Sequence, residues 1–305
     1  MSLHVFANIV TPYGTAANNR AETEGNITTL QKIIWQGQPH TTVSAEAIRF
    51  ALRRLLADAE PNGTNRSWDD AAGCHVWKDD KFRNWNSDSG ETYIDDDLLG
   101  FMTAEAAAEE GEAGKANVRR AVLEVTRAIS LTPWPGDFTF NAASPGATPS
   151  AQKKGTNPVP YGTEVHATRY QYGIAMTPER LRKRDRAAMA IRALVQLRCV
   201  AGNHARYLYD FAPESIVFRL TEDPAPRLLY CFETFDDGRT VDAPVLVQRV
   251  ESGDISAEEL VLAGRWVQTD TVTRLQQHGA RVFNGVRQAA EWVADEITRR
   301  LDAKP

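Results

Sequence analysis

A group of polar side chains near the N-terminus could either bind or cleave a phosphodiester. Residues 15–33 read TAANNRAETEGNITTLQKI, and the charged and amide side chains at the centre of this run are Asn18, Asn19, Arg20, Glu22 and Glu24. Amides donate hydrogen bonds to phosphate oxygens and ribose hydroxyls, and a guanidinium can bind a phosphate through two parallel hydrogen bonds. The glutamates could instead act as acid–base or metal-binding groups. Because no histidine accompanies them in this segment, the pattern favours backbone recognition over cleavage.

Three consecutive aspartates, Asp95, Asp96 and Asp97, form a second candidate. Hard divalent cations prefer carboxylate oxygens, so the run could bind a metal. An exposed acidic loop explains the same residues equally well. We treat the acidic loop as the default interpretation.

Other catalytic patterns are missing from the sequence. The histidines His40, His166 and His204 have no nucleophile motif such as GxSxG beside them, and neither GxxxxGK[ST] nor GxGxxG occurs. Cys74, Cys199 and Cys231 are odd in number and widely spaced, which fits neither a disulfide framework nor a zinc site. We therefore predict no catalytic residue, no metal and no cofactor.

The segment after the polar run predicts an amphipathic helix. In VSAEAIRFALRRLLADA, residues 43–59, apolar residues recur at helical spacing, and Ser44 can cap the first turn. The free N–H groups of such a helix start form a ready anion site. Arg49 and Arg53 are four residues apart and share a face, so they could contact consecutive phosphates. A solvated helix face is an equal alternative.

The charge distribution also suggests an anionic partner. The 305-residue chain has a net charge of −5, but residues 58–112 carry 15 acidic and 4 basic side chains, a local balance of −11. Residues 113–210 carry 15 basic and 6 acidic side chains, a balance of +9. Separated signs within one chain indicate one face for an anion. No basic leader and no apolar run long enough for a membrane occurs, so we expect a cytoplasmic protein without a membrane partner.

The order of predicted elements indicates an α+β fold around an antiparallel sheet of the ferredoxin-like kind. A long segment without a period, residues 58–116, predicts an insertion with a function. A polar excursion rich in Pro and Gly, residues 135–162, predicts a long hairpin with a basic tip. The remaining regular elements are a strand over 3–12, strands or a helix over 118–130, a strand over 163–176, the strongest helix over 178–202, strands over 215–220 and 227–235, and an amphipathic, glycine-interrupted helix at the C-terminus.

Five separated blocks, in this order along the chain, resemble one family. The blocks are TPYGTAANNRAETEGNITTLQKI, HTTVSAEAIRFALRR, LLGFM, TPWPGDFTFN…NPVPYG and GNHARYLYDFAPESI. They are similar to the DevR-type (autoregulator family) backbone subunit of type I CRISPR Cascade surveillance complexes, nearest to subtype I-B. The resemblance implies a modified RNA-recognition fold shaped as a palm with fingers and a thumb. In that family, copies polymerise along the spacer of a CRISPR RNA, and each thumb folds over the neighbour's stretch of RNA.

The resemblance also implies a domain organisation and a set of contacts. It divides one domain, residues 1–305, into a palm core of 1–57, 117–136 and 166–305, a finger-like insertion of 58–116 and a thumb of 137–165. The candidate RNA-binding residues are Asn18, Asn19, Arg20, Lys32, Ser44, Arg49, Arg53, Lys153, Lys154 and His166. The implied partners are CRISPR RNA, the target DNA strand through the guide, neighbouring copies of the chain and other Cascade subunits.

Two alternatives stay open on the sequence. Related type III backbone subunits cut target RNA with an acidic residue of a corresponding loop, where Glu22 and Glu24 lie here, so a metal-dependent endoribonuclease is the first. The family's autoregulator label suggests the second, a protein that acts on its own transcript. The chain lacks the aromatic motif of ordinary RNA-recognition sheets, so base stacking on the sheet is not implied.

Overall fold

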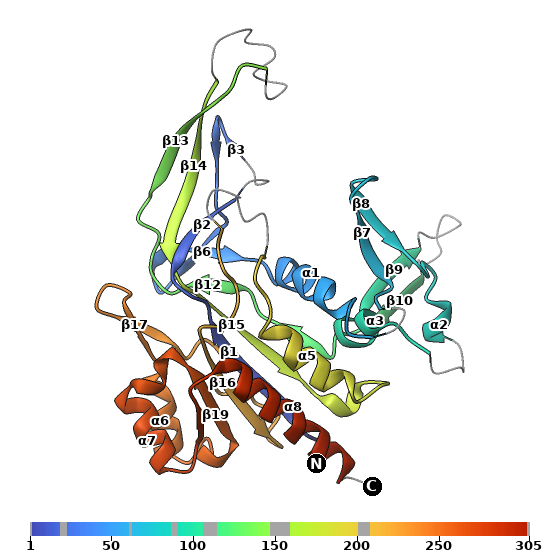
Figure 1. Ribbon diagram of the computed structural model, residues 1–305, viewed down its shortest axis with the longest axis vertical. Helices are drawn as coiled ribbons and strands as arrows, with labels where there is room; N and C mark the ends of the chain where they lie inside the picture. Colours follow the sequence, from blue (N-terminus) through green and yellow to red (C-terminus); the bar gives the residue numbers. More distant parts are fainter. Residues whose placement is uncertain are drawn as a thin grey trace.

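The first strand of the chain lies at the centre of a large sheet (Figure 1). The computed structural model describes residues 2–18, 23–60, 63–86, 91–105, 115–146, 159–200 and 208–303. In it, β1 (His4–Val10) pairs antiparallel with β15 (Tyr170–Met176) on one side and with β16 (Ser215–Thr221) on the other. Two short strands, β11 (Leu123–Val125) and β12 (Ala128–Ser130), pair antiparallel with the far edge of β15.

The connections of this sheet confirm the α+β, ferredoxin-like prediction. Helix α1 (Ala45–Leu56) precedes β11 in the chain, and α5 (Arg186–Leu194) lies between β15 and β16. The strand order β16-β1-β15-β12 with two helical crossovers is the βαββαβ arrangement of ferredoxin-like folds. The sequence left strand or helix open for residues 118–130, and strands are found.

Both edges of the ferredoxin-like core are extended. Beyond β12 follow β6 (Gln38–Val43) and β5 (Lys32–Trp35), and beyond β16 follow β19 (Leu260–Gly264) and β20 (Arg281–Phe283). Gln36 and Gly37 connect β5 to β6 with positive φ angles of 50° and 80°, as a two-residue hairpin turn requires. Residues 15–33, whose polar composition favours a loop, therefore end in the first strand of a hairpin, and they contain three further short strands that are described below.

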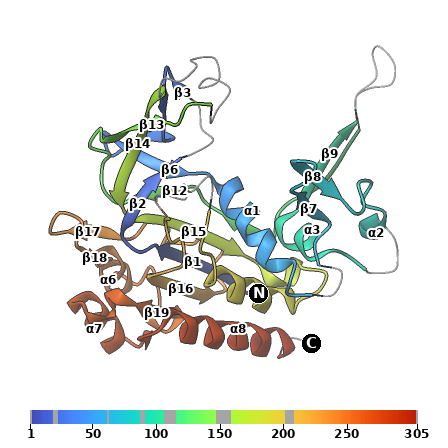
Figure 2. The ribbon, with the colours of Figure 1, turned by 45° about the horizontal axis from the view of Figure 1, so that its top comes forward.

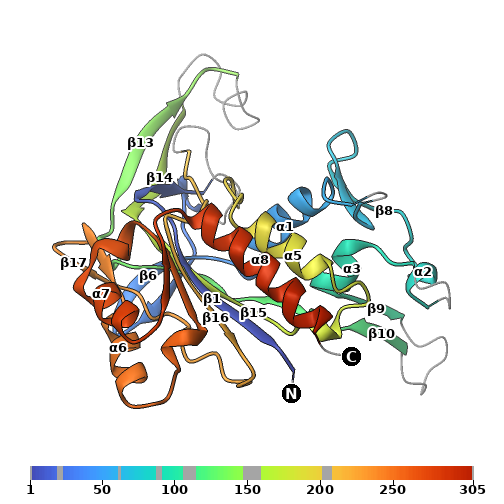
Figure 3. The ribbon, with the colours of Figure 1, turned by 60° about the horizontal axis from the view of Figure 1, so that its bottom comes forward.

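Three helices cover one face of the sheet. Figure 3 shows α5 and α8 (Val286–Asp302) side by side across it, and α1 lies beside them. The stripe on α1 predicted from the sequence is buried at Ile48, Ala51, Leu52 and Leu56. It packs against every second residue of β1, namely Val5, Ala7 and Ile9.

The opposite face of the sheet is closed by the chain itself. Residues 224–232, which we call the strap, cross its central strands, and α6 (Pro244–Glu251) and α7 (Asp270–Gln277) cover the rest. The Tyr230 amide donates to Asn8 Oδ1 at 3.0 Å, and Gln171 Nε2 donates to the Phe232 carbonyl at 3.0 Å. Gly173 lies directly beneath Leu229 of the strap. A Cβ atom added at Gly173 would be only 2.3 Å from Leu229 Cδ2. No open sheet surface is left at these positions.

A long hairpin extends away from the sheet (Figure 1). Its strands β13 (Phe138–Ala143) and β14 (Val159–Thr168) pair antiparallel from Phe138↔Glu164 to Ala143↔Val159. Next to β14 lie β2 (Gly14–Ala17), antiparallel to its lower end, and β4 (Ile27–Thr28), which in turn pairs with β3 (Thr23–Glu24). The predicted hairpin is confirmed, and its lysine-bearing tip lies outside the described residues.

The segment without a sequence period folds into a small lobe, which we call the side lobe. Its elements are β7 (Arg66–Asp69), β8 (Cys74–Trp77), α2 (Arg83–Asn86), α3 (Ile94–Leu99), β9 (Phe101–Glu105) and β10 (Lys115–Arg119). Phe82 and Phe101 stack at its centre with ring centroids 3.7 Å apart. Figure 2 shows the hairpin and the side lobe on opposite sides of α1.

Several predicted elements are shorter or divided. The helix expected over 178–202 is a 3₁₀ turn, Pro178–Arg180, followed by α5 only, because the Asp97 carboxylate accepts the amides of Arg182 and Lys183 between them. The strand expected over 163–176 is divided into β14 and β15, and that expected over 227–235 is reduced to β17 (Glu233–Phe235), paired with β18 (Thr240–Asp242). The C-terminal helix is α7 and α8, separated by β20.

Candidate functional site

Helix α1 begins where the sequence predicts. The Ser44 hydroxyl accepts a hydrogen bond from the Ala47 amide at 3.2 Å, and Ser44 has extended backbone angles, as a helix-capping residue should. Ser44 and Asn18 line the same pocket of about 210 Å³, which we call the helix-start pocket. Asn19 and Arg20 lie outside the described residues, so the structure places only the first of the three predicted loop contacts.

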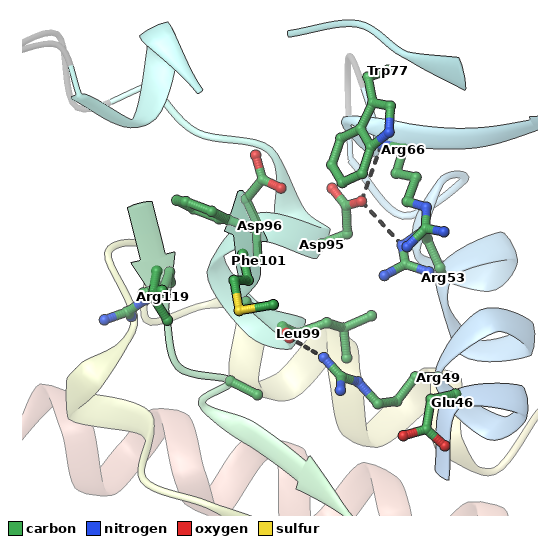
Figure 4. A pocket seen from close by; sticks show the side chains of 14 residues that line it. Glu46, Arg49, Arg53, Arg66, Trp77, Asp95, Asp96, Leu99, Phe101 and Arg119 are labelled. Atoms are coloured by element: carbon green, nitrogen blue, oxygen red, sulfur yellow. Dashed lines mark hydrogen bonds and ion pairs between the residues drawn. The ribbon is translucent and has the colours of Figure 1, made fainter. Parts of the chain in front are cut away.

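The next pocket along α1 contains Arg49 and Arg53 (Figure 4). This arginine pocket has a volume of about 410 Å³ and lies between α1 and the side lobe. Arg49 Nη2 donates to the Leu99 carbonyl, and Arg53 Nε donates to Asp95 Oδ2 at 3.1 Å. The two arginines therefore share a face as predicted. That face contacts the lobe and is not a fully solvated helix surface.

The side lobe adds two arginines that sequence reasoning missed. Arg66 lies over the Trp77 ring at 5.2 Å, and Arg119 lies over the Trp85 ring at 4.9 Å. Arg119 also donates to the Arg180 carbonyl at 2.7 Å. Both line the arginine pocket with Arg49 and Arg53 (Figure 4), and Arg66 comes from a segment with a strongly acidic sequence.

Three of these four guanidinium groups have an unused donor. Within the described part of the chain, the Nε atoms of Arg49, Arg66 and Arg119 are buried and have no hydrogen-bond partner. Buried donors in native proteins are usually satisfied by protein, water or ligand. Burial, followed by the charge of Arg53, lowers the pKa of Arg49 and of Arg66, yet arginines stay protonated in proteins. The arginine side chains of this pocket can therefore donate hydrogen bonds to the oxygen atoms of an anion.

The aspartate run makes buried hydrogen bonds that hold residues of the arginine pocket in place. Asp95, Asp96 and Asp97 are all buried in α3, so the expectation of an exposed acidic loop is wrong. Asp95 accepts from Arg53 and from the amides of Asn65 (2.7 Å) and Arg66 (3.1 Å). In the described ranges, no group of three or more His, Cys, Asp or Glu is arranged to hold a metal ion.

Asp96 differs from its neighbours in its charge state. Its Oδ2 accepts from Asn65 Nδ2 at 3.0 Å, and its carboxylate has no arginine partner among the described hydrogen bonds and ion pairs. Burial and, second, the nearby Asp95 raise the pKa of Asp96 to about 7. Asp96 lines the arginine pocket, so a proton there changes the pocket's net charge near neutral pH.

Comparison with known proteins gives the family. The model of the family described as CRISPR-associated negative auto-regulator DevR/Csa2 matches residues 14–185. A curated protein of Myxococcus xanthus (strain DK1622), "CRISPR-associated protein Cas7/Cst2/DevR", is 65% identical over 288 residues, which cover 94% of this chain and 95% of that protein. The chain belongs to the Cas7/Cst2/DevR family.

Solved structures agree with this family in fold. A chain of a "CRISPR RNA-guided surveillance complex" matches with a TM-score of 0.52 at 13% identity, covering 97% of this chain and 99% of that one. A chain of a "CRISPR RNA-guided surveillance complex, pre-nicking" matches with a TM-score of 0.55 at 10% identity, covering 97% and 100%. At these identities the matches show that the Cas7/Cst2/DevR chain shares their fold. The subtype stays a prediction.

Two further predicted contact residues of this Cas7/Cst2/DevR chain, Lys32 and His166, lie at the base of the hairpin. Lys32 forms an ion pair with Glu164 and lies over the Trp134 ring at 4.1 Å. It is partly exposed, so it can still contact a ligand. Lys153 and Lys154 lie outside the described residues.

His166 differs from the other predicted contacts, because its side chain is in the interior. The residue is only 2% exposed; Nδ1 lies 2.7 Å from Thr41 Oγ1, and Nε2 lies 3.4 Å from Thr132 Oγ1. Burial lowers the pKa of His166 to about 4, so its ring is neutral near neutral pH. These contacts give His166 a structural role, and we leave it out of the interface proposed below.

Of the two carboxylates of the nuclease alternative, the structure describes only one. Glu24 is exposed in β3, and Glu22 lies outside the described residues. Among the helices of the described ranges, none is both long and apolar enough to cross a membrane.

Proposed function

We propose that this chain is a CRISPR RNA-binding backbone subunit, copies of which polymerise along the spacer and hold the guide for recognition of target DNA in a Cascade-type complex. The observation that carries the proposal is the arginine pocket, where three buried Nε donors lack a partner among the described residues. A planar guanidinium group can donate two parallel hydrogen bonds to two oxygen atoms of a phosphate. Family membership and the fold shared with chains of RNA-guided complexes support the same function.

The RNA backbone would follow α1. The helix-start pocket contains Ser44 and Asn18, and the arginine pocket contains Arg49 and Arg53. Ser44 and Arg53 are nine residues apart, which corresponds to about 14 Å along the helix axis. An RNA strand that runs along α1 from Ser44 towards Arg53 would therefore contact amide and hydroxyl groups first and guanidinium groups next.

The contacts would be neutral to base sequence. Arginine, amide and hydroxyl groups bind phosphate and ribose, which are the same in every nucleotide. The sheet face on which RNA-recognition folds stack bases is covered here by the strap. A backbone subunit that accepts any spacer needs contacts that do not depend on base sequence.

We further propose that the subunit holds RNA without cutting it. We expect the subunit to act in the cytoplasm together with other Cascade subunits, and its three free cysteines fit a reducing compartment.

The deciding experiment is purification with a CRISPR array expressed in the same cells. We expect the wild-type chain to elute from size exclusion as a multi-copy particle containing RNA of uniform length. The variant Arg49→Ala/Arg66→Ala should lose the RNA, whereas Arg299→Ala, an exposed arginine on α8, should keep it. A wild-type protein that elutes free of RNA would disprove the proposed function. Cleavage of RNA with magnesium or manganese, abolished by Glu22→Ala or Glu24→Ala, would replace it with the nuclease alternative.

A second function, autoregulation, is favoured by one observation, the description of the matching family as a negative auto-regulator. Autoregulation would require the chain to prefer its own transcript. Competition between that transcript and an unrelated RNA of equal length separates the two functions, because a sequence-neutral backbone subunit binds both with similar affinity.

A further inference from the structure

A recess on the far side of Arg53 has the composition of a nucleobase site. It has a volume of about 220 Å³ and lies between α1 and the β7–β8 hairpin of the side lobe. Three rings line it: Phe50 from α1, and Trp68 and His75, which are opposite each other in the β7–β8 register. We call it the aromatic recess.

The three rings contact one another edge to face. The centroids are 5.5 Å apart for Phe50 and His75, 5.2 Å for Trp68 and His75 and 6.4 Å for Phe50 and Trp68, with interplanar angles of 80°, 83° and 88°. Each perpendicular contact uses the face of one ring only, so faces remain that these contacts do not use. Trp68 is 38% exposed, which is unusual for such a large apolar side chain at the centre of a cluster.

The rim of the aromatic recess is cationic. Arg53, Arg54 and Arg66 surround it, with Asp70 as the only acidic side chain among its lining residues. Arg54 is exposed. Aromatic faces next to arginines are the combination with which proteins bind single-stranded nucleic acid, because every base has a π-face and every nucleotide a phosphate.

The aromatic recess also adjoins the arginine pocket, because Arg53 and Arg66 line both. A phosphate bound between these two arginines would have its own base, or the next one, within reach of Trp68. An apolar protein segment would use the rings but would leave the cationic rim unmatched. The charge of the rim therefore favours a nucleotide.

We propose that the aromatic recess binds one unpaired nucleobase of a strand whose phosphates contact Arg53 and Arg66. The proposal rests on the proposed function and adds to it a base contact outside the sheet. Because stacking does not read hydrogen-bonding edges, the contact tolerates any base. The base can belong to the guide RNA or to a DNA strand, and both have the same stacking chemistry.

Photo-crosslinking tests the site directly. The full-length protein is bound to a short single-stranded RNA, or in a second arm to DNA of the same sequence, in which iodouracil replaces uracil or thymine. After irradiation and trypsin digestion, mass spectrometry should find the adduct on the peptide of residues 67–78, which contains Trp68 and His75. The arm with the stronger adduct identifies the strand. Adducts confined to other peptides in both arms would overturn the proposal.

Affinity measurements on three variants provide the second test. Trp68→Ala should weaken binding of the crosslinked strand between about fivefold and about a hundredfold, as loss of one stacking aromatic does. Trp68→Phe should restore most of it. Phe235→Ala, which removes an exposed aromatic side chain from the β17–β18 hairpin, should change nothing. The salt dependence should be the same for Trp68→Ala and wild type, since no phosphate contact is lost.

The outcomes separate this inference from the proposed function. If Arg49→Ala/Arg66→Ala weakens RNA binding and neither the crosslink nor Trp68→Ala has the expected result, the backbone function stands and the base site is wrong. If wild-type protein binds no RNA at all, both are wrong. Should Trp68→Ala unfold the hairpin, the Trp68→Phe variant and the crosslink still decide.

Discussion

Arg186 Nη1 lies 3.0 Å from Asp97 Oδ2, and both side chains are fully buried. The pair joins α5 of the sheet's helical layer to α3 of the side lobe. Glu60 is a second ion-pair partner of Arg186, and the amides of Arg182 and Lys183 donate to Asp97. The position of the side lobe, and with it the shape of the arginine pocket, depends on this buried connection.

We expect Arg186→Met to destabilise the protein by about 3–5 kcal/mol, because it removes the buried guanidinium that pairs with the carboxylates of Asp97 and Glu60. Asp97→Asn combined with Arg186→Met should cost less than the sum of the single changes, since the two groups share one interaction. Urea unfolding of the four proteins measures the coupling. Fully additive costs would show that the pair does not act as a unit.

The raised pKa of Asp96 predicts a pH dependence of stability. Its pKa in the folded state is about 7, above the ordinary value, so the folded protein binds an extra proton at intermediate pH. The stability that Asp96 contributes is therefore fully present below about pH 4 and is lost as the pH rises to about 7. Asp96→Asn should match the wild type at low pH and melt at a higher temperature at alkaline pH. A constant difference in melting temperature between the two proteins across this range would contradict the assignment.

The same proton should affect anion binding in the arginine pocket. Below pH 7 the carboxyl is neutral, so RNA should bind wild type more tightly at mildly acidic than at alkaline pH. Asp96→Asn should remove most of this dependence. Binding isotherms at fixed ionic strength over this range measure it, and an unchanged pH profile in the variant would exclude Asp96 as the cause.

For His166 we expect a loss of stability without a loss of RNA affinity. His166→Ala removes the ring that Thr41 and Thr132 contact, so the melting temperature should fall. Because its folded pKa is about 4, the wild-type histidine's contribution is present above about pH 6.5 and is lost as the pH falls towards 4. Folded variant protein should bind RNA as tightly as wild type. A weaker affinity at unchanged stability would restore His166 to the interface.

The hairpin predicts a contact between copies. Phe138 and Phe140 alternate with half-buried residues on β13 and are 55% and 74% exposed. Exposed apolar side chains on one face of a strand indicate a partner surface. Phe140→Asn should change the free energy of unfolding of the free chain by about 0.5 kcal/mol or less, and it should reduce the number of copies per RNA measured by mass photometry.

A shortened hairpin offers an independent form of this test. Replacing residues 144–158 with a short Gly linker leaves every pair from Phe138↔Glu164 to Ala143↔Val159 in place. We expect the free chain to fold and the ordered multi-copy assembly to be lost. Assemblies of normal size would mean that the hairpin is only a surface feature.

The parts of the fold with local signals were predictable from the sequence. β1 and α1 have strong periods, and Ser44 is a preferred capping residue, so their positions agree with the structure. The helix expected over 178–202 begins only at Arg186, because the side chain of Asp97, distant in sequence, accepts the amides of Arg182 and Lys183 before it. Helix propensity is a local property of the sequence and does not include such a long-range contact.

The candidate site was only half predictable for the same reason. Arg49 and Arg53 are marked by their spacing on one helix. Arg66 and Arg119 are far apart in sequence: Arg66 lies inside the segment with a negative net charge, residues 58–112, and Arg119 lies beyond its end. The negative charge of that segment does not correspond to an acidic surface throughout, because Asp95 and Asp97 are buried and bind arginines and amides inside the protein.

The strap across the sheet has a consequence for how a complex would be started. If the backbone contacts and the stacking contact are the same for every nucleotide, a single copy has no preferred binding position on an RNA strand. It could bind anywhere and slide, and a row of copies would begin at random positions. The first copy must then be located by a mark at one end of the RNA, read by a different subunit. In such an assembly the length of the RNA would set the number of copies of this chain, and a different subunit would set the position of the first copy.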